Sequence, residues 1–435
     1  MDIATRMAAQ GLIEREMERL QALHRFLDYY EGRHRRFLRP TRDGHDDNVV
    51  LNRCAILVDL QAHYLFGKGI HVQVGDERRD VFEEHLVDVM KRNRFDVFLL
   101  DLAITGSVFG HYFIKILPAD PVPRLVLLDP LNVTILAAPD DIDYVVGYRI
   151  RYFADREGRP VLARQDVVRD DRGRWWIFDG VEEGRVFRIE KRMEWPYPFA
   201  PIVDGKNLPA PHSVYGRSDL ERVIQTQDAI NFLASSIRRV LRLRGHPVTV
   251  IRGAVPKDVD LSPDRVLFLP KDAEISSLEM SGDLSAMREM LDRLIDHFDE
   301  QAFIPRIALG RIDASSASGV ALQINFRPLL AVIEAKRRLY GHALATLFRR
   351  LLVMRFGGQE EDYDVQIVWP DILPVNAQEA VQTALLKMQV GVSQETLLRE
   401  LGYDPEAEAI RRRVGAEDAA EQLLQALERR GEAEP

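Results

Sequence analysis

Residues 216–245 read GRSDLERVIQTQDAINFLASSIRRVLRLRG, and this stretch decides the fold. Its apolar residues recur at steps of three and four, which predicts a helix over residues 217–244 with one apolar face. Ser218 is expected to cap the first turn, and Gly245 with Pro247 should end the helix. At ~1.5 Å per residue the helix would be roughly 40 Å long.

A second amphipathic helix is predicted from Asp283 to about Phe303, with Pro305 at its end. Between the two helices, turn clusters separate three short β-prone runs, at residues 246–251, 265–269 and 275–280. Because so few strands cannot bury a core alone, partner strands from a neighbouring subunit would fit here.

A joint of small residues follows the second helix: Ala314-Ser315-Ser316-Ala317-Ser318-Gly319. Such residues permit a mobile loop. A third helix is predicted from this joint to about Arg355. Pro328 lies inside it, removes one backbone donor and should kink the helix near Arg327.

The flanking sequence predicts an α+β fold. Helices are expected over residues 11–31, 52–66 and 81–108. The basic run 33–36 is interpreted as a solvated turn or a subunit contact, and direct DNA contact is the alternative. Alternating residues then predict a mainly antiparallel meander. Its strands are expected at 111–117, 124–128, 133–136, 145–153, 161–168, 175–178 and 185–190, with one more at 365–369 and charged helices after residue 374.

Composition bounds the function classes. The 435 residues can bury a sizeable core, and the single cysteine, Cys54, excludes an intramolecular disulfide and a cysteine-based metal cluster. No apolar run reaches the ~18 residues of a membrane span, and the amino terminus lacks a signal-like stretch, so we expect an intracellular protein when it is made. The net charge of -9 argues against a broad nucleic-acid-gripping surface.

Aromatic residues of the meander are expected to be core or interface anchors. They are Trp175, Trp176, Trp195 and Tyr197. Basic residues are not regularly interleaved with them, as they would be in a base-stacking platform.

Several strings, in order over most of the chain, resemble the bacteriophage portal proteins, in particular those of long-tailed double-stranded DNA phages. The strings are Tyr29-Tyr30-Glu31-Gly32-Arg33-His34, Asn52 with Ile56-Leu57-Val58-Asp59, Tyr64-Leu65-Phe66-Gly67-Lys68-Gly69, Tyr215-Gly216-Arg217-Ser218-Asp219-Leu220-Glu221, Gln227-Asp228-Ala229-Ile230-Asn231 and Ser318-Gly319-Val320-Ala321-Leu322. Each is weak individually, and their order and spacing carry the resemblance.

The resemblance implies a portal fold with an α/β wing, a two-helix stem, a small β-containing clip, a kinked tunnel helix and a helical crown. The implied boundaries are 1–216 for the wing, 217–244 for the first stem helix, 245–282 for the clip, 283–304 for the second stem helix, 305–327 for the tunnel loop and start of the kinked helix, 328–375 for the returning wing and 376–435 for the crown.

Portal proteins form a ring, usually a dodecamer, at one capsid vertex. The implied partners are double-stranded DNA in the channel, the large terminase, major capsid and scaffolding proteins and a head-tail adaptor. No membrane, cofactor or metal is implied. The expected location is the virion, with assembly in the host cytoplasm.

The implied site residues fall in three groups. The tunnel loop would contribute Ile312, Asp313, Ser315, Ser316, Ser318 and Val320, and the clip would present Lys257, Asp258, Asp264 and Lys271 to the motor or adaptor. The acidic second stem helix is expected to line the channel with Glu289, Asp292, Asp296 and Asp299, because a conduit must not hold phosphates firmly. The first stem helix carries arginines 238, 239, 242 and 244 near its clip end, and many of its arginines should instead pair with neighbouring subunits or face outward. Ordinary solvated helix faces are the alternative for both charge sets.

Catalytic interpretations find little support. The run Phe66-Gly67-Lys68-Gly69 lacks the remainder of a phosphate-binding loop, so ATP hydrolysis is assigned to a separate motor. Asp140, Asp141 and Asp143 could bind a divalent metal together with a distant histidine, but they lie in a Pro-flanked turn, which favours a hydrated loop. His297 has no nucleophile or base partnered with it in the sequence, which favours an interface histidine. We therefore expect a non-enzymatic conduit. A metal-dependent nuclease and another ring-forming neck protein are the alternatives.

Overall fold

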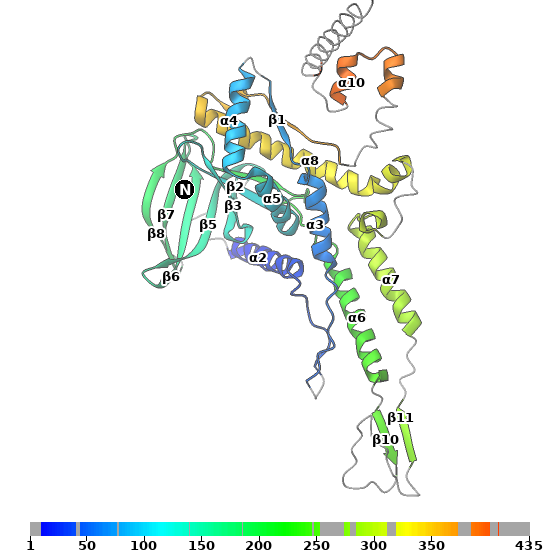
Figure 1. Cartoon of the computed structure of the whole chain (residues 1–435). Coiled ribbons are helices and arrows are strands. Elements are labelled where there is room, and N and C mark those ends of the chain that lie inside the picture. Colours follow the sequence, from blue (N-terminus) through cyan, green and yellow to red (C-terminus); the bar gives the residue numbers. More distant parts are fainter. Residues whose placement is uncertain are drawn as a thin grey trace, which may run out of the picture. The chain divides into compact units, whose positions relative to one another are not determined.

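The computed structural model describes residues 10–40, 44–75, 78–138, 140–184, 186–245, 248–252, 274–278, 284–310, 319–372, 384–400 and 408 (Figure 1). The described residues up to 310 and those from 321 to 370 belong to one compact unit, and those after Pro370 belong to a second. The predicted α+β class is confirmed, because the first unit combines long helices with antiparallel sheets.

Helices of the first unit bury apolar faces against one another. They are α2 (Gln10–Tyr30), α3 (Arg53–Phe66), α4 (Arg79–Arg92), α5 (Phe95–Phe109), α6 (Ile224–Gly245), α7 (Leu284–Gln301) and α8 (Gly319–Phe356). Asn52 caps α3, because its side chain accepts the Ala55 N–H at 3.1 Å. The helix α8 continues through Pro328, as predicted, and its kink stays a prediction.

Five strands form the meander that the alternating sequence predicts. They are β4 (Val133–Ala137), β5 (Val145–Arg156), β6 (Arg159–Arg169), β7 (Trp175–Glu183) and β8 (Val186–Glu194), paired antiparallel in chain order. One face forms a core with Val133 opposite Ile150 and Ile135 opposite Tyr148. The aromatic-anchor prediction is confirmed for Trp175 and Trp195, which are buried there.

Two smaller sheets complete the β structure of the first unit. β3 (Arg124–Leu128), β2 (His111–Leu117) and β9 (Ile202–Lys206) form a three-stranded sheet, and β1 (His71–Val74) pairs with β12 (Val365–Val368). The strands β1 and β9 were not predicted. Each is short and finds its partner far away in the sequence, so local alternation gives little signal for it.

The insertion between α6 and α7 pairs with itself. β10 (Val248–Arg252) lies antiparallel to β11 (Glu274–Leu278), with Val250 opposite Ser276, so these two strands have a partner within the chain. The third expected strand, at 265–269, lies outside the described residues. In the second unit, α10 (Gln394–Glu400) follows Ser393, whose hydroxyl accepts the Thr396 N–H at 3.3 Å.

One sequence expectation about α6 is wrong. The helix begins at Ile224 and not at Arg217, and Ser218 caps no helix. Its hydroxyl donates toward the carbonyls of Ser107 and Val108 at the end of α5. Gly110 explains this packing, because a Cβ there would lie 2.6 Å from the Ser218 nitrogen. The chain at 216–218 is therefore pressed against α5 and cannot coil into a helix.

A buried ion pair fixes α8 to this turn. Lys336 is fully buried, and its Nζ lies 2.5 Å from Asp219 Oδ2 and 3.0 Å from Ser107 Oγ. Burial lowers the pKa of Lys336, and the Asp219 carboxylate opposes that effect. Asn207 donates to the other Asp219 oxygen at 3.1 Å. The charge is therefore tolerated only as part of a complete network.

Replacing Lys336 should strongly destabilise the first unit. The change Lys336→Met leaves Asp219 buried without its cation, and the expected loss is about 3 to 5 kcal/mol in free energy of unfolding. Urea denaturation at fixed protein concentration measures it. Arg338→Met, at an exposed position of the same helix, is the control and should change little. Equal stabilities of the two variants would contradict the role of the pair.

Candidate functional site

The helices α6 and α7 lie side by side and share one apolar cluster (Figure 1). Ile224 and Ile230 of α6 meet Phe298 of α7, and Cys54 and Leu57 of α3 complete the cluster. Thr226 Oγ1 also donates to Gln301 Oε1 at 2.8 Å. Both helices therefore pack against α3 as a common base. Cys54 is buried in this cluster, and its thiol is free.

A different face of α6 is polar and completely buried. Gln227, Asn231 and Ser235, one turn apart, are each at most 1% exposed. Their oxygens accept the backbone N–H groups of Arg53, Leu51 and Val49, at 3.0, 3.0 and 2.9 Å. Every fourth helix residue thus binds every second residue between Val49 and Arg53, the first residue of α3. We call this set of contacts the polar ladder.

Spacing explains why the polar ladder works. Four helical residues rise ~6.0 Å, at about 1.5 Å each. Two extended residues advance ~6.6 Å, at about 3.3 Å each. The two repeats match over the extended step from Val49 to Leu51. A turn at Asn52 follows, where the Arg53 N–H lies 2.9 Å from the Leu51 carbonyl and also reaches Gln227.

The extended segment is the second half of an arm, which we define as residues 33–40 and 44–52. Asn48 closes its two halves, accepting the N–H groups of Phe37 and Leu38 at 3.0 Å each and donating to the Leu38 carbonyl at 2.7 Å. His34 belongs to the first half of the arm, and its Nδ1 accepts a hydrogen bond from Asn231 Nδ2 at 2.7 Å. Burial lowers the pKa of His34, which favours the neutral ring that this contact needs.

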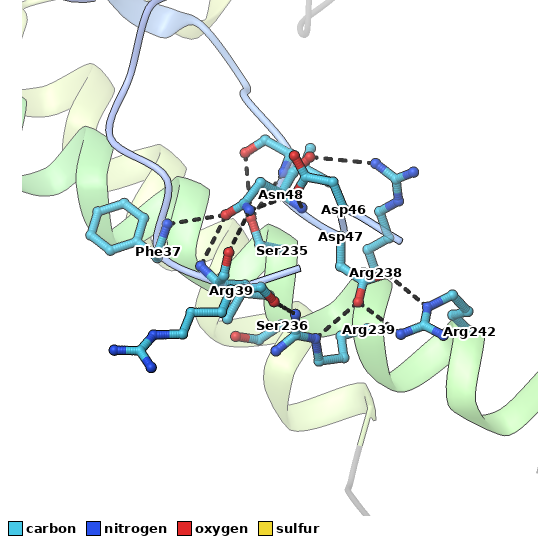
Figure 2. Close-up of polar contacts among 12 residues, drawn as sticks. Phe37, Arg39, Asp46, Asp47, Asn48, Ser235, Ser236, Arg238, Arg239 and Arg242 are labelled. Carbon is cyan, nitrogen blue, oxygen red and sulfur yellow. Dashed lines mark hydrogen bonds and ion pairs between the residues drawn. The ribbon is translucent and has the colours of Figure 1, made fainter. Parts of the chain in front are cut away.

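The arm ends its contact with α6 at a buried carboxylate (Figure 2). Asp47 has a side chain only 2% exposed, and it accepts from Arg239 Nε at 2.9 Å and from Arg242 Nε and Nη2 at 2.8 and 3.0 Å. These guanidinium groups hold the pKa of Asp47 far below its usual range. Arg239 Nη2 also donates to the Arg39 carbonyl at 2.7 Å, which draws in the first half of the arm.

These contacts correct two expectations. Arg239 and Arg242 do not face outward, because they neutralise a buried carboxylate of the same chain. The run 33–36 is also more than a solvated turn, since His34 is buried within it. The remaining arginines of that run are exposed, and Arg36 pairs with Asp46 at 3.0 Å. Arg244 has no described side-chain environment.

The acidic residues of α7 divide into two sets. Glu289 and Asp292 are exposed and Asp296 is half-exposed, on the side of the helix opposite its apolar stripe. Glu289 pairs with Arg293 and Asp296 with Arg306, each at 2.5 Å. The prediction that Asp299 faces the channel is wrong. It is 3% exposed and forms a buried ion pair with Arg53 at the start of α3.

Other predicted site residues are not brought together by the described structure. The clip residues Lys257, Asp258, Asp264 and Lys271 and the loop residues Ile312, Asp313, Ser315, Ser316 and Ser318 lie outside it. Val320 lies in the first turn of α8, with its side chain also outside.

The acidic turn and His297 are also located. Asp143 pairs with Lys206 at 3.2 Å, and within the described ranges no group of three acidic, histidine or cysteine residues could hold a metal. His297 is exposed on α7, and its Nδ1 lies 3.8 Å from Glu300. Among those same residues, no helix has both the length and the apolarity to cross a bilayer.

Comparison with known proteins gives the family to which this chain belongs. Residues 10–430 match the family model described as "Phage portal protein, SPP1 Gp6-like". The chain therefore belongs to the phage portal protein family, as its sequence strings suggested. Comparison with curated protein sequences gives no match.

Solved structures with the same fold come from gene transfer agent particles. A chain of the neck of an empty particle, computed with C6 symmetry, is 17% identical, with a TM-score of 0.51 and coverage of 81% of this chain and 90% of that one. A chain of the native particle's virion is 15% identical, with a TM-score of 0.50 and the same coverage. At these identities the likeness concerns the fold alone.

The polar ladder was not found by sequence reasoning. A signal existed, because Gln227, Asn231 and Ser235 recur every four residues on a helix whose other faces carry apolar residues. Polar residues at that spacing normally indicate a solvated face. Only the position of the arm shows that this face is buried.

Removing the Asp47 charge should release the arm. In Asp47→Asn, two half-buried guanidinium groups lose their shared carboxylate, so amide hydrogen exchange in residues 44–52 should become at least about tenfold faster. Mass spectrometry of deuterated peptides measures it. Asp143→Asn, in the turn before β5, removes an exposed carboxylate that pairs with Lys206 and has no part in the arm, and it is the control. Equal exchange in the two variants would show that Asp47 does not hold the arm.

Proposed function

We propose that this chain is the portal protein of a virion. Copies of it close a ring at one capsid vertex, and double-stranded DNA enters and leaves through the central channel. Membership of the portal family over residues 10–430 is the observation that carries the proposal. The α6–α7 pair gives it a physical basis, because two long helices with a common base in the wing can serve as one segment of a channel wall.

The parts of the chain receive roles from this proposal. Residues 1–216 and 328–375 form the wing, α6 and α7 form the stem, 245–282 form the clip, 305–327 form the tunnel loop with the start of the kinked helix, and 376–435 form the crown. The clip faces the large terminase and later the head-tail adaptor, and capsid and scaffolding proteins surround the wing. The chain itself performs no catalysis. Assembly takes place in the host cytoplasm, where the terminase, capsid proteins and DNA meet.

The exposed acids of α7 give the channel its physical chemistry in this proposal. Glu289, Asp292 and Asp296 face the DNA and repeat once per subunit, so the wall repels phosphates along its whole circumference. Arg293 and Arg306 offset part of this charge at exposed positions, where ion pairs are weak. A wall of this kind lets DNA slide, whereas a belt of cations would hold it.

Ring formation is the first test. Purified full-length protein, imaged by electron microscopy, should show closed rings with a central channel, most of them with twelve copies. The expected number follows from the family and not from the fold. Well-folded monomers at every concentration, also in the presence of capsid protein, would contradict the proposal.

Charge reversal tests the channel wall. Rings of Asp292→Lys should bind duplex DNA at least about tenfold more tightly than wild-type rings at low salt, because each subunit adds a phosphate contact, and the gain should vanish as salt is raised. Fluorescence anisotropy of labelled DNA measures it. Glu84→Lys, at an exposed position of α4, is the matched control. Equal DNA binding by both variants would place Asp292 away from the channel.

A further inference from the structure

A cavity of about 500 Å³ lies between the α4–α5 turn and the start of β3. Its lining includes three arginines, Arg92, Arg94 and Arg124, and a single carboxylate, Asp120. The whole protein carries a net charge of -9, so this local excess of cations runs against the overall balance. We propose that the cavity binds a phosphate group, a property that goes beyond the channel function.

One side chain brings the three arginines together. Asn93 Nδ2 donates to the Val89 carbonyl at 2.9 Å and to the Pro123 carbonyl at 3.0 Å, and its Oδ1 accepts the Leu125 N–H at 2.8 Å. Arg92 and Arg94 flank Asn93 in the sequence, and Arg124 lies between the two residues that Asn93 holds. The backbone positions of all three arginines are therefore fixed to one another.

The guanidinium groups of these three arginines have N–H groups that can donate to a ligand. Within the described ranges, Arg92 forms an ion pair through its Nε alone, which lies 3.2 and 3.1 Å from the two carboxylate oxygens of Asp88. Within the described part of the chain, Arg94 and Arg124 form no ion pair, and both are exposed at the cavity. A guanidinium offers parallel N–H groups that match two phosphate oxygens, which makes arginine the preferred residue for this anion.

The size of the cavity indicates the kind of ligand. A volume of about 500 Å³ is within the range of small-molecule sites, ~300 to 1,000 Å³, and exceeds what a bare phosphate fills. The open cavity therefore has room for a phosphate that belongs to a larger group, either a free nucleotide or the backbone of DNA. Both present the same chemistry to the three arginines, and the experiment below separates them.

The test uses two double variants of the full-length protein. Arg94→Asn with Arg124→Gln removes two cavity cations. Asn suits position 94, because the backbone there is left-handed, at φ 49°, and Asn accepts that conformation readily. Arg159→Gln with Arg172→Gln removes two exposed arginines from hairpin turns of the five-stranded sheet and is the control. Unfolding midpoints of both variants verify that they are folded.

Inorganic phosphate and a short DNA duplex are the two probes. Calorimetric titration at low salt should show phosphate binding by the wild type and the control, weakened at least about tenfold in the cavity variant. If duplex binding weakens in parallel, the DNA backbone is the source of the phosphate; if it does not, a free nucleotide is. Single Arg124→Gln should show a smaller loss and serves if the double variant unfolds. No phosphate binding by the wild type, or equal weakening in the cavity and control variants, would overturn the proposal.

Discussion

The polar ladder is the interaction on which the position of α6 depends. A helix that buries Gln227, Asn231 and Ser235 would be unstable if their polar groups had no partners, since an unsatisfied buried donor or acceptor costs ~1 to 3 kcal/mol. The extended arm supplies those partners at matching intervals. The helix and the arm therefore stabilise each other, because the polar groups that each one buries find their hydrogen-bond partners on the other.

This constraint gives α6 distinct surfaces with separate tasks. One carries the polar ladder and the two arginines that bind Asp47, and another packs on α7 through Ile230 and Thr226. Phe232 is about half exposed on the helix. In a ring, such a residue would be available to a neighbouring copy, whereas the faces that bind the arm and α7 are already occupied.

The acidic residues on and around α6 and α7 are of two kinds, buried and exposed. Asp47 and Asp299 look like surface acids in the sequence, yet both are buried and bound to arginines of distant segments. Such pairs fix which segments meet, and loss of one partner leaves an uncompensated charge. Glu289 and Asp292 remain exposed and give the helix its acidic surface. The same residue types thus hold the fold in one place and set the surface potential in another.

The sequence by itself determined the class and most of the elements. Alternation located β2 and β3 to the residue, periodicity located α7 within two residues at each end, and the ordered strings indicated the portal family. These signals are local, because they depend on which side of one element is apolar. The tertiary structure alone decided that α6 begins at Ile224, where the chain leaves its contact with α5, and that Asp299 is buried against Arg53. It alone also decided that the arm binds α6. Those outcomes depend on contacts between residues more than a hundred positions apart, and no spacing within one segment encodes such a contact.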